Sequence, residues 1–394
     1  MTISKLVFTP ISYTGWGSLQ QLLPEVKKYD PAHILIVTDP VLKDIGLVDK
    51  VSTPLIQNGY EVDVYADTVP EPPLALGEKL VSYAKSRKFD LVIGVGGGSA
   101  LDLAKLTAVL AVHDGAVEEY LNLTGTKQIS KKGLPKILIP TTSGTGSEVT
   151  NISVLSLEST KDVVTHDYLL ADVAIVDPEL TLSVPPKVTA ATGVDALTHA
   201  VEAYISVNAN PATDALALKA IRMISSSLRT AVENGKDKEA RTQMSYGSYL
   251  AGLAFFNAGV AGVHALAYPL GGQFHISHGE SNAVLLPYVM GYIRSSCVAK
   301  MRDIFEALGG NVSSLSEEEA SYQCVKQLQS LVEDVGIPQT LRGFNIPESA
   351  LQKLTADGVQ QKRILARSPL PLHEKDIRAI YQSAYDGAIV EPVH

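Results

Sequence analysis

Four residues in the second half of the chain have types and spacing that suit a metal ion. Asp195 and His199 are four positions apart in a stretch, 192–200, that we expect to begin a helix, so both side chains leave the same face. His264 follows in the next long helical region, and His278 comes fourteen residues later. A lone histidine is more often a core residue, and acidic–histidine pairs occur on solvated helices. The apolar, glycine-rich surroundings favour the metal site.

One carboxylate and three imidazoles form a ligand set for a divalent transition metal. They suit Fe²⁺, Zn²⁺, Ni²⁺, Co²⁺ or Mn²⁺, whereas Cys297 and Cys324 do not have metal-site spacing. Such a site can keep one coordination position open. The ion then acts as a Lewis acid that polarises a carbonyl or stabilises the alkoxide of an alcohol. Paired with a nicotinamide, this chemistry predicts hydride transfer.

A glycine-rich turn in the first half offers a phosphate site. It consists of Gly96, Gly97, Gly98 and Ser99. An apolar strand expected at 90–95 leads into it, and a helix pattern follows. Glycine lets backbone N–H groups approach a ligand closely, and a helix start adds partial positive charge. The dinucleotide fingerprint counted from Gly94 would need glycine at Ser99, and such a turn is often only a tight connection.

Two more segments place polar groups after strands. The strand expected at 136–140 is followed by small or hydroxylated residues throughout 141–147, and Asp39 ends the strand expected at 33–38. Ligands of open α/β sheets bind at the carboxyl ends of the strands. The hydroxyls would contact phosphate, and the Asp39 carboxylate would accept the ribose hydroxyls of an adenosine and repel a 2′-phosphate. A capping turn and a simple Asp-Pro turn are the alternatives.

These segments need a framework of strands and helices to position them. The pattern predicts strands at 33–38, 60–65, 90–95, 136–140 and 173–176, and a helix at 74–88. Strands separated by helices indicate a mainly parallel sheet covered on both faces. After Pro185-Pro186 the spacing is helical, and we expect prolines between the helices, at Pro211, Pro269, Pro287, Pro338 and Pro347. We therefore predict an α/β domain over 1–184 and an all-helical domain over 185–394.

The composition excludes several classes of protein. The formal net charge of −9 and the pI near 5.5 argue against a nucleic-acid partner. No apolar run approaches the length of a membrane span, and the N-terminus lacks the apolar core of a signal peptide. Two cysteines cannot form a disulfide framework. We expect a cytoplasmic enzyme with no nucleic-acid or membrane partner.

Five segments give the chain a specific resemblance to the iron-containing (group III) alcohol dehydrogenase family. They are GGGSALDLAK (96–105), PTTSGTGSEVT (140–150), ATGVDALTHAVEAYIS (191–206), ANPATD (209–214) and GVHALAYPLGGQFHISHGESNAVLLP (262–287). The resemblance implies an N-terminal Rossmann-like domain, a C-terminal helical domain and an active site in the cleft between them. This is the architecture shared with dehydroquinate synthase. It also implies NAD(H)-linked interconversion of a small alcohol and its aldehyde or ketone, with Fe²⁺ as the first choice of metal, in a homo-oligomer that is a dimer or larger.

The resemblance also assigns roles to individual residues. Those expected to bind the metal are Asp195, His199, His264 and His278. Those expected to line the NAD site are Asp39, Gly96, Gly97, Gly98, Ser99, Asp102, Thr141, Thr142, Thr145, Ser147, Lys161, Thr181 and Leu182.

The chain departs from the family pattern at three places. Family members often have a histidine, a proton-relay candidate near the nicotinamide, where this chain has Tyr268. We predict that His275 relays the proton instead and that Tyr268 shapes the nicotinamide pocket. A loop contact of His275, with water carrying the proton, is the alternative. The family's Asn-Pro-Arg stretch appears as residues 367–370, and Glu71 stands where the family often has asparagine.

Other functions stay open at this point. A maleylacetate reductase-like or hydroxyacid–oxoacid transhydrogenase-like enzyme would use the same kinds of site. A dehydroquinate synthase-like lyase needs lysines and arginines to clamp a polyanionic substrate, and 191–211 and 246–291 contain neither. A catalytically silent NAD- or metal-binding protein is disfavoured because all four ligand positions are filled.

Overall fold

The computed structural model describes residues 3–157 and 161–390. These residues form two compact units, one of residues 8–183 and one that joins the chain from residue 184 onward to the segment ending at Val7. The side chain of Asn257 holds that segment, because it accepts a hydrogen bond from Val7 N (2.7 Å) and donates one to Val7 O (3.0 Å). The predicted domains, 1–184 and 185–394, did not include this grouping of the N-terminal segment with the second unit.

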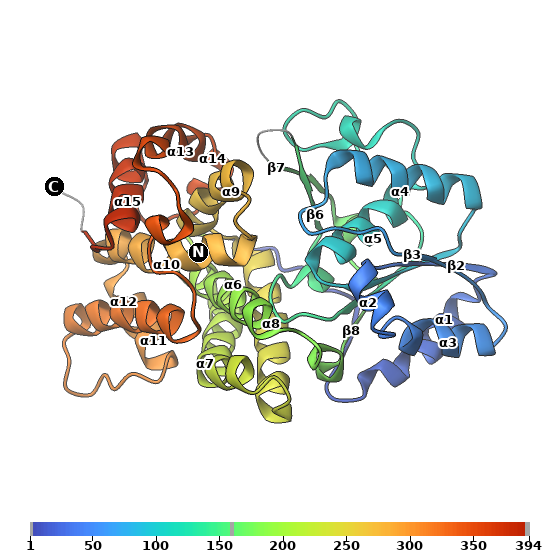
Figure 1. Ribbon diagram of the computed structural model, residues 1–394, viewed down its shortest axis with the longest axis horizontal. Helices are drawn as coiled ribbons and strands as arrows, with labels where there is room; N and C mark the ends of the chain where they lie inside the picture. Colours follow the sequence, from blue (N-terminus) through green and yellow to red (C-terminus); the bar gives the residue numbers. More distant parts are fainter. Residues whose placement is uncertain (1–2, 158–160, 391–394) are drawn as a thin grey trace. The chain divides into compact units, whose positions relative to one another are not determined.

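The first unit is built on a six-stranded sheet in which every neighbouring pair is parallel (Figure 1). Its strands are β1 (Ile11–Thr14), β2 (His33–Val37), β3 (Glu61–Tyr65), β4 (Leu91–Gly96), β5 (Lys136–Pro140) and β8 (Val173–Val176), in the order β1-β8-β5-β4-β2-β3. All five predicted strands are confirmed. The edge strand β1 was missed, and so was the antiparallel pair β6 (Ile152–Ser156) and β7 (Lys161–Thr165). β1 is four half-buried residues and carries little apolar signal.

Helices cover both faces of the sheet, as the sequence predicted. On β2, Leu35 and Val37 pack with α4 (Leu74–Arg87) and α5 (Gly98–Leu110). Ile34 and Ile36 point the other way and pack with α1 (Leu22–Tyr29) and α3 (Asp49–Gln57). Figure 1 shows these two helix pairs on opposite sides of the strands. The carboxyl ends of the strands remain as the edge where loops can bind a ligand.

The second unit is helical and packs around one apolar core. Its helices are α6 (Pro186–Ile205), α7 (Pro211–Glu233), α8 (Lys238–Ala258), α9 (Gly262–Phe274), α10 (His278–Ile293), α11 (Val298–Ala307), α12 (Glu317–Asp334), α13 (Leu351–Val359), α14 (Lys362–Leu365) and α15 (Glu374–Asp386). From Gly193 to Ile205 every residue of α6 is buried. This central helix therefore has polar side chains in the interior, where they need partners.

Two details of the helical prediction were wrong. The helix that carries Asp195 begins at Pro186 rather than near Thr192, because Pro186 occupies a first-turn position, where its missing N–H does no harm. Pro269 and Pro287 lie inside α9 and α10 instead of between helices. Leu270 and Leu286 beside them are fully buried, so packing outweighs the lost backbone hydrogen bonds.

No single helix among the described residues is long and apolar enough to cross a membrane. Taken together, the bent pair of α8 and α9 is long and apolar enough to do so, but this rests on length and composition alone.

Candidate active site

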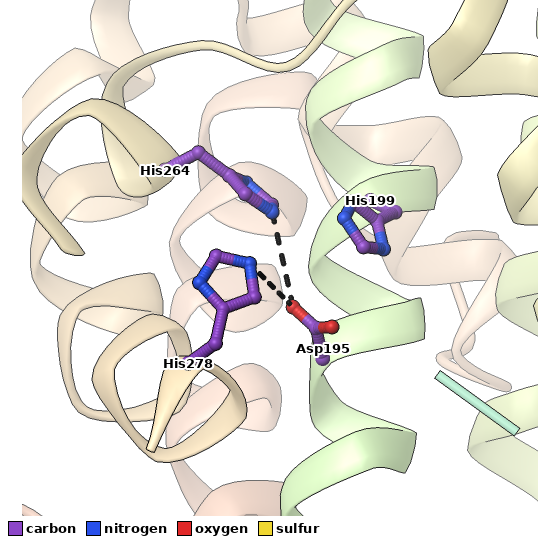
Figure 2. A group of neighbouring side chains, drawn as sticks. All are labelled: Asp195, His199, His264 and His278. Carbon is purple, nitrogen blue, oxygen red and sulfur yellow. Dashed lines mark ion pairs between the residues drawn. The ribbon is translucent and has the colours of Figure 1, made fainter. Parts of the chain in front are cut away.

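Three helices of the second unit bring the four predicted metal ligands together (Figure 2). α6 supplies Asp195 and His199, α9 supplies His264 and α10 supplies His278. One ligand atom from each residue lies within 4.8 Å of all the others. From Asp195 Oδ1 the distances are 3.8 Å to His264 Nε2 and 3.6 Å to His278 Nε2. Residues spread over 84 positions of sequence thus form one cluster (195 to 278, both included).

The lone pairs of this cluster converge on one point. The amide nitrogen of Asn282 lies 2.7 Å from Asp195 Oδ1, 3.1 Å from His264 Nε2 and 3.2 Å from His278 Nε2. One side-chain NH₂ group, with two hydrogens, thus faces an oxygen and two ring nitrogens of the four-residue set. The buried Oδ1 of Asn282 has no hydrogen-bond partner among the described residues. Acceptors that converge on one donor in this way also fit a divalent cation, and the N/O donor set suits the transition metals.

Asp195 is ionised in this setting. Burial alone raises the pKa of its carboxyl group, but attraction to His199, His278 and His264 and the hydrogen bond from Asn282 more than offset that effect. The pKa therefore lies below its usual range. The site keeps a negative charge for a cation at neutral pH.

Ring packing fixes the orientation of His199. Its imidazole stacks on Phe255 at a centroid distance of 4.2 Å and on His264 at 4.6 Å. Phe255 comes from α8, so a fourth helix contributes to the cluster. This apolar wall next to the ligands limits water access and restricts the rotamers of the imidazoles.

Sequence reasoning missed two polar residues of the cluster. Asn282 is four residues after His278, and Glu202 is three residues after His199 on α6. Glu202 Oε2 lies 2.6 Å from His264 Nδ1. Helical spacing from a predicted ligand was the available signal, but it does not say which neighbour points at the ligand atoms.

The two proton-relay candidates have different surroundings. Tyr268 shares α9 with His264, and its ring centroid lies 6.0 Å from that of His278. His275 follows the end of α9 in a left-handed conformation, φ 54°, and is exposed. Among the described residues its imidazole makes no hydrogen bond or ring contact with the cluster.

The residues predicted for NAD follow four adjacent strands of the parallel sheet. Asp39 follows β2, Gly96 ends β4 and residues 97–99 follow it, residues 141–147 follow β5, and Thr181 follows β8. The order β8-β5-β4-β2 puts all four segments at one edge. The chain turns from β2 outward to β3 and then returns to β4, so the edge includes a topological switch point, where α/β sheets bind ligands.

Two contacts bring the loops at this edge together. Asp39 caps the short helix α2 (Pro40–Asp44), since its Oδ1 accepts from Leu42 N at 3.0 Å. Its Oδ2 lies 3.6 Å from the point where a Cβ on Gly96 would stand. A Cβ on Gly98 would lie 2.7 Å from Thr145 Cγ2, so the first loop needs glycine to pack against the second.

Asp102 and Ser147 are joined by a buried side-chain hydrogen bond next to these loops. Asp102 Oδ1 accepts from Ser147 Oγ (2.5 Å) and lies 2.9 Å from Lys105 Nζ, while its Oδ2 accepts from Val154 N (2.9 Å). Lys105 is fully buried, and it donates to Ser147 O at 3.0 Å and to Thr150 Oγ1 at 3.2 Å. The structure thus gives Asp102 protein partners at both oxygens.

Lys161 is connected to the glycine loop through Glu71. Its Nζ lies 2.8 Å from Glu71 Oε1, and Glu71 N donates to Ser99 Oγ at 3.2 Å. Glu71 has φ 52°, a left-handed conformation in which asparagine is more comfortable than glutamate. The side chains of Thr141 and Thr181 are buried, and Thr181 Oγ1 donates to Pro178 O at 2.7 Å.

An arginine packs against Gly259, five residues before the predicted ligand His264. A Cβ on Gly259 would stand 2.5 Å from Arg367 Cδ, and Gly259 closes the bend before α9. Burial and the charge of Arg363 lower the pKa of the Arg367 guanidinium, while Tyr268 raises it. Segments 191–211 and 246–291 have no lysine or arginine, but the fold brings Arg367 against the second of them.

Comparison with known proteins covers both units. Residues 10–178 match the family described as iron-containing alcohol dehydrogenase, and residues 189–385 match the C-terminal region of the Fe-containing alcohol dehydrogenase family. Long-chain-alcohol dehydrogenase 1 of Geobacillus thermodenitrificans (strain NG80-2) is 74% identical over 100% of this chain and 99% of its own length.

Solved structures agree with this match. A 1,3-propanediol oxidoreductase superposes with a TM-score of 0.93 at 35% identity, covering 98% of this chain and 100% of that one. Sulfoacetaldehyde reductase from Bifidobacterium kashiwanohense, in complex with NAD⁺, superposes with a TM-score of 0.87 at 27% identity over 98% of this chain and 99% of that one.

Proposed function

The chain belongs to the iron-containing alcohol dehydrogenase family, and on that premise we propose that it oxidises long-chain primary alcohols and reduces their aldehydes, with Fe²⁺ at the four-residue cluster. The general activity, NAD-linked interconversion of an alcohol and its carbonyl compound, follows from the family and its members. The cluster of Asp195, His199, His264 and His278 carries the proposal, because an alcohol dehydrogenase needs a group that activates the substrate oxygen.

The four side chains would hold the cation, and their chemistry limits which cation. A divalent ion bound there supplies Lewis acidity toward the oxygen of the alcohol or carbonyl. Three imidazoles and one carboxylate suit Fe²⁺, and Zn²⁺, Co²⁺, Ni²⁺ and Mn²⁺ accept the same donors. Phe255, stacked on His199, keeps one side of the cluster apolar. These residues would thus fix the ligand geometry and keep water from one side of the cluster.

The carboxyl edge of the sheet would hold NAD(H). Gly97 and Gly98 start α5 directly after Gly96, where backbone N–H groups and the helix dipole would favour phosphate. Asp39 beside Gly96 would accept the adenosine ribose hydroxyls. Thr141, Thr142 and Thr145 would add hydroxyl contacts, and Thr181 and Leu182 would close the edge at β8. Asp102 and Ser147 would support the loops rather than contact the nucleotide, since each is bonded to the other.

Oxidation of the alcohol also releases the hydroxyl proton. We propose His275 as the residue that relays it, and Tyr268 as a wall of the nicotinamide pocket. Tyr268 lies nearer to the ligand His278, whereas His275 has the imidazole suited to proton transfer near neutral pH. The pH dependence of turnover tests this assignment. His275→Asn should slow turnover and change its pH dependence, while Tyr268→Phe stays close to wild type. An unaltered profile in His275→Asn would mean that another group carries the proton.

The substrate proposal rests on a relative that is 74% identical to this chain and on the apolar side chain beside the ligands. A protein 74% identical along the whole chain is a long-chain-alcohol dehydrogenase. Phe255 on α8, half-buried and stacked on His199, offers hydrocarbon surface for an alkyl chain. Arg367 is the one observation that favours the alternative, an aldehyde that carries an anionic group.

The experiment is a panel of aldehydes assayed with NADH and Fe²⁺-loaded protein. We expect kcat/KM to rise from short to long alkyl aldehydes and to be low for sulfoacetaldehyde and succinic semialdehyde. The Arg367→Met variant is the matched control, because it should leave the alkyl series unchanged. A preference for anionic aldehydes that Arg367→Met abolishes would replace the long-chain proposal. Metal analysis of His264→Ala, expected to lose most of the ion while staying folded, tests the cluster itself.

A reducing compartment and a homo-oligomer remain predictions of the sequence. Both cysteines, Cys297 and Cys324, are buried and free, which suits a cytoplasmic protein. Sedimentation of the purified protein tests the oligomer.

A further inference from the structure

Glu202 is a buried carboxylate beside the four predicted metal ligands, and it has no role in the proposed reaction. It lies on α6, seven residues after Asp195 and three after His199, and its exposed fraction is 0%. Its only ion pair among the described residues is with His264. A buried carboxylate without lysine or arginine needs strong hydrogen-bond donors or a nearby cation to remain ionised.

The first donors are backbone N–H groups at the start of α9. Glu202 Oε1 accepts from Val263 N at 2.6 Å, and Oε2 lies 3.4 Å from His264 N. The residue before the helix, Ala261, has no side chain that can cap it. Glu202 therefore caps α9 from a different helix, at the end where the dipole favours negative charge.

The second donor is the ring of His264. Its Nδ1 lies 2.6 Å from Glu202 Oε2, and an ionised carboxylate carries no hydrogen, so it can only accept from the ring. With Glu202 ionised, the ring proton is on Nδ1. The other nitrogen, Nε2, keeps its lone pair and is the atom that lies 3.8 Å from Asp195 Oδ1. The carboxylate thus selects the tautomer that can bind a metal.

We propose that Glu202 is a positioning residue for the metal, one that fixes the tautomer and orientation of His264 and adds negative charge behind that ligand. The proposal rests on the proposed function, because it takes His264 as a ligand. Through this contact the carboxylate would make the imidazole more electron-rich and so stabilise a cation held by Nε2. The same contact aligns α9 with α6.

The test compares Glu202→Gln with Asp237→Asn. Both change a helix-capping carboxylate to an amide, and Asp237 caps α8 through Ala240 N at 2.8 Å without touching the cluster. We expect Glu202→Gln to weaken Co²⁺ binding roughly 10- to 100-fold, measured by competition with a chelator, and to alter the visible spectrum of the Co²⁺ protein. Asp237→Asn should keep the wild-type affinity and spectrum. Unfolding temperatures of the metal-free proteins report the capping effect separately.

An unchanged Co²⁺ affinity and spectrum in Glu202→Gln, together with a lower unfolding temperature, would reduce Glu202 to a helix cap and overturn the proposal. A second measurement needs no variant that could misfold. In metal-free wild-type protein labelled with ¹⁵N-histidine, His264 should show its proton on Nδ1, and a proton on Nε2 would also overturn the proposal. Wild-type protein that binds no metal would instead refute the proposed function, so the two failures are distinguishable.

Discussion

At the scale of single residues, the Asp39 carboxylate stands at the sheet edge beside Gly96 and should decide the choice of nucleotide. A 2′-phosphate placed there would face a like charge a few Å away, which costs on the order of 1–4 kcal/mol. That free energy corresponds to a roughly tenfold to thousandfold preference for NADH over NADPH. Asp39→Gly should therefore raise kcat/KM for NADPH relative to NADH. An unchanged ratio would mean that other residues bind the adenosine. Asp44→Gly, on the same short helix α2, is the control.

The Glu148 carboxyl group should make stability depend on pH. Burial raises its pKa from 4.5 to about 7, although Lys105 acts in the opposite direction. Between these pH values the folded chain binds more protons than the unfolded chain, so stability falls as pH rises from about 4.5 to about 7.

Glu148→Gln removes this proton linkage. The free energy of unfolding of the variant minus that of the wild type should therefore increase from pH 5 to pH 8, by at most about 3 kcal/mol. Thermal unfolding at both pH values measures the gain, and Glu233→Gln, at an exposed position, is the control. A difference between Glu148→Gln and wild type that is the same at both pH values would show that Glu148 stays ionised through this range.

At the scale of elements, the sequence predicted regular segments well and their exceptions poorly. The strand at 136–140 is an apolar run between turn residues, and it is present as β5. Pro269 and Pro287 suggested helix ends, but tertiary packing in the core keeps both inside helices. Glu202 and Asn282 could not be selected from sequence, because their roles depend on how α6, α9 and α10 face one another.

The two glycines that start α5 should respond differently to a methyl group. A Cβ on Gly98 would lie 2.7 Å from Thr145 Cγ2, whereas the nearest atom to a Cβ on Gly97 is 3.6 Å away. Gly98→Ala should therefore lose roughly 1–3 kcal/mol of stability by overpacking, and Gly97→Ala should stay within about 0.5 kcal/mol of wild type.

Both variants should bind NADH more weakly, because a Cβ keeps phosphate away from the backbone. Unfolding and NADH titration separate the two effects. Thr145→Ala in the Gly98→Ala background removes both clashing atoms and should restore stability without restoring the affinity. Normal NADH binding by Gly97→Ala would place the phosphates elsewhere.

At the scale of the whole molecule, the chain divides the chemistry between its two units. All four predicted metal ligands lie in the helical unit, and all the residues predicted for NAD lie in the unit of residues 8–183. Each set is assembled by its own fold, the first by three helices and the second by adjacent parallel strands. Metal binding and nucleotide binding can therefore be measured as separate events.

Hydrogen exchange read by mass spectrometry should show this division directly. A ligand present at about 100 times its dissociation constant stabilises the unit that binds it by about 2.7 kcal/mol, which corresponds to roughly 100-fold slower exchange through openings that release the ligand. Zn²⁺ alone should therefore protect peptides from 191–206 and 262–282, and NADH alone should protect those from 96–105 and 141–150. The Glu202→Gln protein should show the NADH pattern unchanged and a reduced Zn²⁺ pattern, because only the helical unit has been altered. Equal protection of the glycine loops by Zn²⁺ alone would mean that the two units open together as one cooperative body, and the separation of the two binding events would then be wrong.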